Sequence, residues 1–208
     1  VLEKKGFLLV DSGATYMDGT TDITRTYPLG ELTEDEKRFY TWTLQSHIDL
    51  AKAVWLDYCE CKMIDTIARE PLWRHLINYR CGTGHSVSFV GNVHEGPHAL
   101  NSRNTIRMRP GMVVTDEPGV YETDLVGIRI ENELVCFLKA DNQYGTFLGF
   151  EPLTFVPIAT SPILPGVLDK DELAWLNDYH RQVFAKLAPH LNAEERVWLA
   201  EKCASIGC

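Results

Sequence analysis

Four acidic residues stand where the surrounding sequence predicts apolar β-strands. Asp11 follows the run Phe7–Val10, Asp22 lies among threonine and isoleucine, Glu117 follows a second apolar run, and Glu131 follows an alternating strand. An ionised carboxylate in such a strand carries a heavy desolvation cost unless a cation or another partner lies beside it. The fold must therefore bring these four side chains to partners that offset their charge.

The spacing of the acids groups them into two pairs. The sequence midpoint of Asp11 and Asp22 falls in a loop, and so does the midpoint of Glu117 and Glu131. Each pair is therefore predicted to face across a hairpin. A tight two-residue turn at Asp18-Gly19 would put Asp11 and Asp22 out of register, so we expect a wider or bulged loop there.

Two carboxylate pairs brought together require cations. Two divalent ions would neutralise the four charges and hold both hairpins at one centre. Oxygen ligands favour manganese or magnesium, and one imidazole widens the choice to cobalt, zinc or iron. His85, which lies between glycine and small residues, is the candidate nitrogen ligand. Any one acid alone would be interpreted as a salt-bridge partner or a turn cap, but the matched pairs together with His85 favour a metal site.

Composition excludes several classes of partner. The chain has 208 residues, 45% of them hydrophobic, and a formal net charge of −9, which is typical of a globular domain with its own core. The acidic balance argues against nucleic acid and against an anionic membrane surface as partners. No apolar run reaches the roughly 18 residues of a membrane helix. The six cysteines include no CxxC pair, which favours reduced thiols over a structural zinc site.

Strand signals predict a mixed α/β fold of the α+β class, built from antiparallel hairpins. Residues 6–28 are predicted to form one hairpin, residues 127–135 a strand with clean alternation, and residues 150–158 a further apolar strand.

The helices are predicted from short sequence patterns at their ends. Capping boxes predict helix starts at Thr33, Asp169 and Asn192, each with a glutamate three residues later. A further helix is predicted from about Lys62, and Pro71 is expected to end or kink it.

Five motifs carry a family resemblance, and in chain order they are Asp11–Thr26, Gly82–His85, Asn92–Pro97, Thr115–Gly119 and Gly127–Asn132. Their order and spacing resemble the Xaa-Pro aminopeptidases (aminopeptidase P). These enzymes belong to the pita-bread superfamily with prolidase, methionine aminopeptidase and creatinase. The resemblance implies a pita-bread fold, in which a curved, largely antiparallel sheet is covered by helices. It also implies a partial catalytic domain over residues 1–158 and a helical C-terminal extension over residues 159–208.

The resemblance implies a role for each of the five candidate ligands. Asp11 would chelate one divalent ion, Asp22 and Glu131 would bridge two, and His85 and Glu117 would complete the shell of the other. Manganese is the usual metal of the family, with cobalt, zinc, iron or magnesium as alternatives.

The same resemblance implies a reaction. A hydroxide held between two metal ions would attack the carbonyl before a proline in the second position of a peptide. Glu117 would be the general base, and His94 would bind the substrate or stabilise the tetrahedral intermediate. Arg129, and Tyr121 with it, would orient the carboxylates.

One position departs from the family pattern. Cys81 stands four residues before His85, where the family usually has a histidine that helps to hold the substrate. Cysteine is smaller and cannot donate two hydrogen bonds. Either the change is neutral drift to a thiol, or it alters substrate preference or turnover.

Length is the second departure. The catalytic domain of the family normally begins earlier, so we expect an N-terminally incomplete domain whose activity alone is weak or absent. The full-length protein is expected to be a cytoplasmic, homodimeric peptidase. The alternatives are a prolidase acting on Xaa-Pro dipeptides and a non-catalytic pita-bread binding module.

Overall fold

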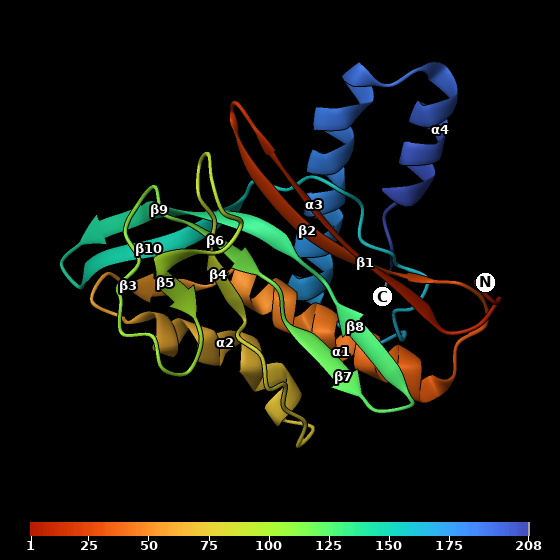
Figure 1. The fold of residues 1–208 in the computed structure, drawn as a ribbon, viewed down its shortest axis with the longest axis horizontal. Coiled ribbons are helices and arrows are strands. Elements are labelled where there is room, and N and C mark those ends of the chain that lie inside the picture. Colours follow the sequence, from red (N-terminus) through yellow and green to blue (C-terminus); the bar gives the residue numbers. More distant parts are fainter. Residues whose placement is uncertain (208) are drawn as a thin grey trace.

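A computed structural model describes residues 1–207 of the chain. Figure 1 shows the arrangement of its elements. In chain order they are β1 (Phe7–Tyr16), β2 (Gly19–Pro28), α1 (Glu34–Ala51), β3 (Val54–Leu56), α2 (Cys61–Trp73), β4 (Gly84–Ser86), β5 (Glu95–Leu100), β6 (Val113–Asp116), β7 (Gly119–Glu122), β8 (Val126–Arg129), β9 (Asn132–Asn142), β10 (Gly145–Pro152), α3 (Lys170–Leu187), the 3-10 helix η1 (Ala188–His190) and α4 (Ala193–Lys202).

The strands form one larger sheet and two hairpins. The sheet has six strands in the order β3-β10-β9-β6-β4-β5, while β1-β2 and β7-β8 pair separately. All of these ladders are antiparallel, so the predicted fold class is confirmed. Helices α1 and α2 cover one face of the six-stranded sheet, as Figure 1 shows.

A buried apolar cluster joins the C-terminal helices to the strands that lead into Glu131. Its members come from α1, from β8 and the residues after it, and from α3, and they include Leu44, Ile48, Ile128, Ile130, Leu176 and Val183. The apolar positions on α3 recur at helical spacing, so they form one face that packs inward. Residues on both sides of position 158 therefore share one core.

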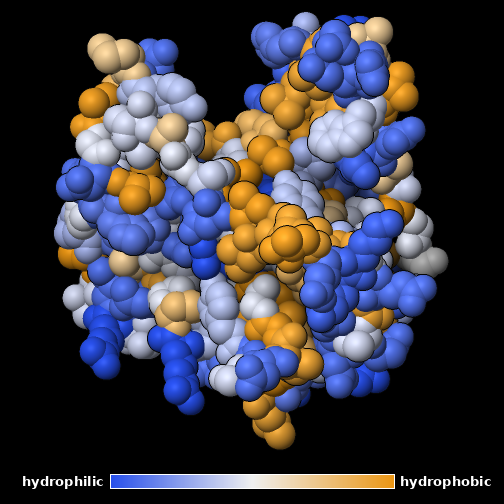
Figure 2. Space-filling model, turned by 45° about the vertical axis from the view of Figure 1, so that its right-hand side comes forward, coloured by the Kyte–Doolittle hydropathy of each residue, from blue (hydrophilic) through white to orange (hydrophobic). Residues whose placement is uncertain are grey.

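The β1-β2 hairpin tip and the α3-α4 end project to the same side of the molecule (Figure 1). Figure 2 shows a notch between two projections, with apolar residues gathered across the middle of that face. No described helix is both long enough and apolar enough to cross a membrane. The cysteines at positions 59, 61, 81, 136 and 203 are free thiols, and Cys208 lies outside the described residues.

The predicted helix starts are confirmed, because Thr33, Asp169 and Asn192 each cap a helix through a reciprocal box. Pro71 lies inside the last turn of α2, which ends two residues later. A proline so close to the end disturbs only the terminal turn of the helix.

Two strand predictions need correction. The strand expected over residues 127–135 is divided into β8 and β9 around residues 130 and 131. The strand expected over residues 150–158 stops at Pro152, after which the chain leaves the ladder. Both segments keep an apolar pattern, but their backbones change partners, which periodicity alone does not reveal.

Candidate metal centre

The first hairpin closes more tightly than predicted. Strand β1 pairs with β2 so that Asp11 faces Thr24 and Asp22 faces Gly13, and the turn has only two residues, Met17 and Asp18. The expectation of a wider or bulged loop is therefore wrong. Positions two apart on a strand share a face, so Asp11 and Asp22 lie on the same face as diagonal neighbours. Both carboxylates still point to one side of the hairpin.

Gly13 is required by this register. A Cβ atom at Gly13 would lie 2.3 Å from the carbonyl oxygen of Thr21 on the opposite strand. Any side chain there would push the strands apart next to Asp22.

The second pair is aligned as predicted. The β6-β9 ladder ends at the pair Asp116–Asn132, and the β7-β8 ladder resumes the same register three residues further on, at Gly119–Arg129. Glu117 and Glu131 therefore stand opposite one another between the two ladders. Each is held by paired strands on both sides.

Three side chains from different strands meet at one point. Ligand atoms of Asp22, His85 and Glu131 all lie within 4.8 Å of one another. His85 Nε2 lies 3.4 Å from Asp22 Oδ2 and 3.1 Å from Glu117 Oε1. Four of the five candidate ligands thus converge, whereas Asp11 forms an ion pair with Arg129.

The carboxylates of this cluster perturb one another. Burial, followed by the charges of Glu117 and Asp22, raises the pKa of Glu131 to about 8. Burial disfavours charged His85, but hydrogen bonds to Asp22 and Glu117 outweigh it and raise its pKa to about 10. The carboxylates contribute to both shifts, after burial in the case of Glu131, and a cation at this point would offset their negative charge.

Arg129 connects the ligands to one another. Its Nε donates to Thr24 Oγ1 at 2.9 Å, its Nη1 donates to Tyr121 Oη at 2.6 Å, and its Nη2 donates to Asp11. Its Nε also lies 3.8 Å from Glu117 Oε2. Arg129 and Tyr121 thus lie where a group that orients the carboxylates would be needed.

Two threonine hydroxyls hold the glutamates and were not predicted from the sequence. Thr24 Oγ1 donates to Glu131 Oε2, and Thr115 Oγ1 donates to Glu117 Oε1 at 2.8 Å. Thr115 precedes Glu117 by two residues, so the same-face spacing was a usable signal.

His94 and Cys81, the two other candidate residues, differ in their surroundings. The His94 ring lies 4.0 Å from the His85 ring, centroid to centroid, in an edge-to-face arrangement. Cys81 is exposed, and its carbonyl oxygen accepts a hydrogen bond of 2.9 Å from Arg69 Nη2. Partial burial raises the pKa of the Cys81 thiol, and the negative charge of Glu117 adds to this shift.

His47 is fully buried next to the strands that carry the cluster. Its Nδ1 lies 3.1 Å from Asp116 Oδ2, and its Nε2 lies 3.3 Å from Asn132 Nδ2. Burial raises the pKa of Asp116 to about 6, although His47 opposes the shift. This pair supports the residues next to Glu117 and Glu131 from inside the protein.

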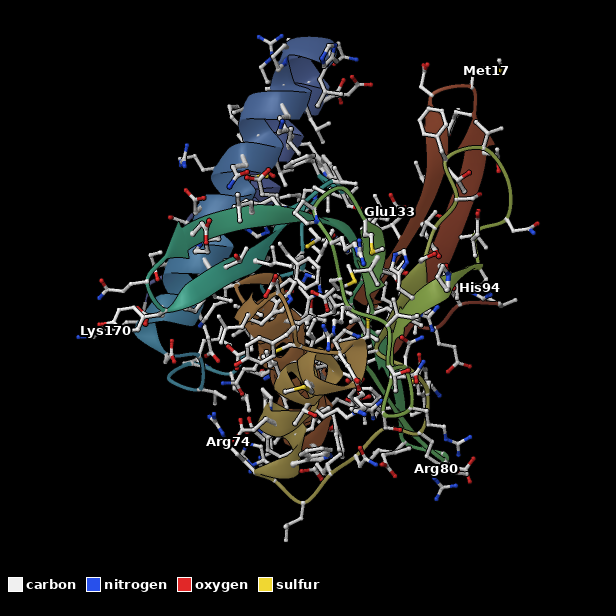
Figure 3. All side chains as sticks on the ribbon, turned by 90° about the vertical axis from the view of Figure 1, so that its left-hand side faces the viewer. Met17, Arg74, Arg80, His94, Glu133 and Lys170 are labelled. Atoms are coloured by element: carbon white, nitrogen blue, oxygen red, sulfur yellow. The ribbon has the colours of Figure 1, made fainter. Side chains whose placement is uncertain are left out.

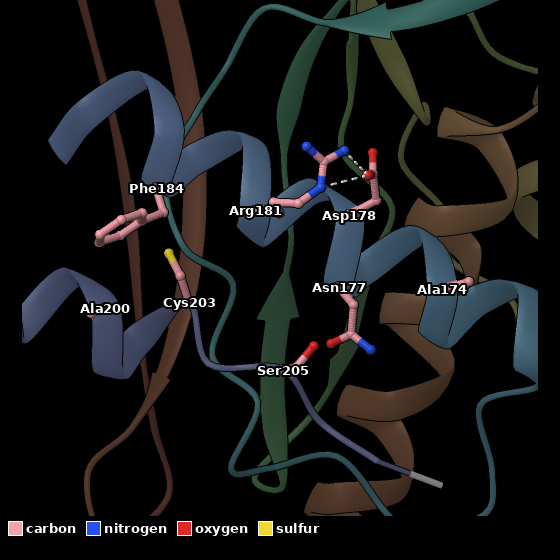
Figure 4. Close-up of a pocket in the computed structure, with 8 residues that line it drawn as sticks. All are labelled: Ala174, Asn177, Asp178, Arg181, Phe184, Ala200, Cys203 and Ser205. Atoms are coloured by element: carbon pink, nitrogen blue, oxygen red, sulfur yellow. Dashed lines mark hydrogen bonds and ion pairs between the residues drawn. The ribbon is translucent and has the colours of Figure 1, made fainter. Parts of the chain in front are cut away.

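The donor set fits divalent ions. Carboxylate oxygens with a single imidazole suit hard and borderline divalent metals, and such an ion would offset the negative charge described above. The groove between α3 and α4 offers no comparable set, as Figure 4 shows. That groove is lined by an Asp178–Arg181 ion pair, Phe184 and the Cys203 thiol, among other described residues.

Comparisons with known proteins agree with this geometry. Residues 1–136 match the model of metallopeptidase family M24, and residues 146–206 match the model for the C-terminal region of that peptidase. A probable Xaa-Pro aminopeptidase P of Laccaria bicolor is 39% identical over 99% of this chain and 33% of its own length. Aminopeptidase P1 of Lotus japonicus is 41% identical over 99% of this chain and 32% of its own length. The chain thus spans about a third of the length of the curated relatives that it matches.

Solved structures give the same result. The X-prolyl aminopeptidase of Caenorhabditis elegans, described as a cytosolic enzyme with a di-nuclear active site, superposes with a TM-score of 0.91. It is 39% identical and is matched over 96% of this chain and 34% of its own. The prolidase of Pyrococcus furiosus superposes less well, with a TM-score of 0.62 and 28% identity over 73% of this chain and 42% of its own.

Proposed function

Because the chain belongs to metallopeptidase family M24 and has its pita-bread fold, we propose that it carries the metal centre of an Xaa-Pro aminopeptidase. The proposed substrate is a peptide with proline in the second position, cleaved at its N-terminal Xaa-Pro bond. The observation that carries this proposal is the convergence of Asp22, His85 and Glu131, with ligand atoms within 4.8 Å of one another. The aminopeptidase P relatives match 99% of this chain, whereas the prolidase of Pyrococcus furiosus is matched over 73% of it, which favours the aminopeptidase over a dipeptide-specific prolidase.

The residues fit two divalent ions, and we propose manganese. Asp11 would hold one ion, Asp22 and Glu131 would be shared, and His85 and Glu117 would hold the other. When bound, the ions would supply Lewis-acid polarisation of the scissile carbonyl and an activated water.

The chain's own groups would perform the remaining steps. Glu117 is the proposed general base, since Thr115 holds one of its oxygens while the other faces Arg129 at 3.8 Å. His94 would donate a hydrogen bond to the substrate oxygen that gains negative charge. Arg129 would keep Asp11 and Thr24 in place while substrate enters.

Metal binding by the purified chain tests the ligand set separately from turnover. We expect calorimetric titration of the metal-free protein with manganese to give two ions per chain. Asp22→Asn and Glu131→Gln remove the shared ligands and should lower the stoichiometry. Glu194→Gln, at an exposed position of α4, should leave it unchanged. Unchanged stoichiometry in both ligand variants would refute the assignment.

Hydrolysis tests the proposed reaction. A peptide with proline in the second position should be cleaved, weakly by this chain alone, and its alanine counterpart should not. Cleavage confined to dipeptides would indicate a prolidase, and metal binding without any cleavage would favour a binding module. A cytoplasmic location and a homodimer of the full-length protein complete the proposal. Cell fractionation and analytical ultracentrifugation test these two points.

A further inference from the structure

A buried polar network joins α2 to the segment between α2 and β4. Figure 3 shows Arg74, at the C-terminal end of α2, and Arg80, on that segment, at the same end of the molecule. The network starts from Asp65 and Arg69, which stand four residues apart on one face of the helix. Arg69 Nε donates to Asp65 Oδ2 at 2.7 Å, and the two residues are 7% and 1% exposed. A buried ion pair must overcome the desolvation of both charges and adds little stability by itself, so its role lies in the groups that it holds.

Both members of the ion pair hold the segment after α2. Arg69 Nη1 donates to the carbonyl oxygen of Tyr79 at 2.8 Å, and its Nη2 donates to the carbonyl oxygen of Cys81 at 2.9 Å. Asp65 Oδ1 accepts from the hydroxyl of Thr83, so this hydroxyl is in turn the acceptor for Tyr79 Oη at 2.6 Å. Thr83 and Tyr79 are buried as well, so these contacts are shielded from water.

Thr83 connects this network to two of the candidate ligands. Its carbonyl oxygen accepts a hydrogen bond of 2.8 Å from the backbone N–H of Glu117. Thr83 also stands two residues before His85, whose backbone N–H donates to Thr115 Oγ1 at 3.0 Å. A Cβ atom on the intervening Gly84 would lie 1.8 Å from the carbonyl oxygen of Thr115, so the two strands approach one another closely here. The separation of His85 and Glu117 is therefore set by Thr83 and the backbone around it.

We propose that Asp65 and Arg69 are positioning residues for the metal ion held by His85 and Glu117. The proposal rests on the proposed function, in which these two ligands belong to one ion. Within residues 1–207, no hydrogen bond links Asp65 or Arg69 directly to a candidate ligand, so they act through Thr83. The ion assigned to the carboxylate on β1 lies outside this series of contacts, and its affinity should not depend on them.

Calorimetric titration of the metal-free chain with manganese tests the proposal. Asp65→Asn cannot accept from both Arg69 and Thr83, because an amide nitrogen replaces one of the two carboxylate oxygens. We expect one of the two binding events to weaken roughly 10- to 100-fold, as for other groups that orient metal ligands, and the other event to stay unchanged. The weakened event should be the one that His85→Gln removes.

Matched variants separate positioning from a general loss of stability. Glu70→Gln breaks the exposed ion pair with Arg74, which has the same spacing on the same helix, and should keep both affinities. Thr83→Val replaces only the hydroxyl that binds Asp65 and should weaken the same event, whereas Thr83→Ser keeps the hydroxyl and should bind as the wild type does. A defect of the fold as a whole would lower the amplitude of both events together. The two Thr83 variants decide the question if Asp65→Asn does not fold.

The outcomes distinguish this inference from the proposed function. Wild-type affinity for both ions in Asp65→Asn and in Thr83→Val would overturn the inference and leave the proposed function intact. Equal weakening of both events in these variants would also overturn it. Selective weakening without any cleavage of a peptide with proline in the second position would support the inference and count against the peptidase. Failure of the wild-type chain to bind two ions would reject both.

Discussion

Arg25 Nη2 donates a hydrogen bond of 2.7 Å to Oδ1 of Asn132, which lies 107 residues further along the chain. The Arg25 side chain is buried, and its Nη1 donates to the carbonyl oxygens of Thr24 and Glu131. Its Nε donates to the carbonyl oxygen of Pro157, and Nη2 also lies within hydrogen-bond distance of the Val156 carbonyl oxygen and the Tyr179 hydroxyl. A single guanidinium therefore holds β2, the backbone of a candidate ligand and the C-terminal region together.

Arg25→Met is expected to lower the free energy of unfolding by about 3 kcal/mol or more, because it leaves several buried carbonyl groups without donors. Tyr179→Phe removes only one hydroxyl of the same network and should cost about 1 kcal/mol. Urea unfolding of both metal-free variants measures the difference. Equal losses would show that the network does not depend on the guanidinium.

Manganese is expected to stabilise the folded chain, because the ligands converge only in the native state. An ion present at 100 times its Kd adds about 2.7 kcal/mol to the free energy of unfolding. Thermal unfolding should shift upward with manganese and back with a chelator. The shift should be lost in Asp22→Asn, and its persistence there would place the bound ion elsewhere.

Stability is expected to fall in acid through His180. Its Nε2 accepts a hydrogen bond of 3.1 Å from the backbone N–H of Ile158, which requires the neutral ring. Burial, and after it the charge of Arg25, lower its pKa to about 4. The unfolded chain binds this proton from about pH 6.5 downward, so stability is present above that pH and is lost toward pH 4.

The full loss through His180 is about 3 kcal/mol. His180→Gln keeps an acceptor but cannot titrate in this range. The difference between the two stability curves from pH 7 to pH 4 should therefore grow as the pH falls. Parallel curves would rule out His180 as the cause.

Cys81→His is expected to raise kcat/KM on an Xaa-Pro peptide roughly tenfold or more, because imidazole adds a donor beside the metal centre. Cys81→Ser, which restores no imidazole, is the control. An unchanged rate in Cys81→His would favour neutral drift at this position.

Local signals predicted the helices well. The capping boxes at Thr33, Asp169 and Asn192 depend only on residues three apart, so the sequence contains all that is needed. The pairing of Glu117 with Glu131 was also within reach, because one regular register runs through both ladders.

The first hairpin shows why the other parts of the site, which depend on contacts between strands, could not be predicted from local signals. Direct pairing of Asp11 with Asp22 was assumed, but a diagonal arrangement across Gly13 brings both to one face with a shorter turn. The Arg25 network and the His47–Asp116 pair depend on segments far apart in the sequence. No spacing rule connects such residues until the tertiary structure brings them together.

The β6-β9 and β7-β8 ladders share one register, and this limits how the length of the chain between Glu117 and Glu131 can vary. Inserting or deleting one residue between Glu117 and the tip would turn the glutamate to the opposite face of its strand. Residues 123–125, at the hairpin tip beyond the Glu122–Val126 pair, lie outside both ladders. Insertions and deletions should therefore be tolerated at that tip alone, which makes it the natural place for a tag or a graft.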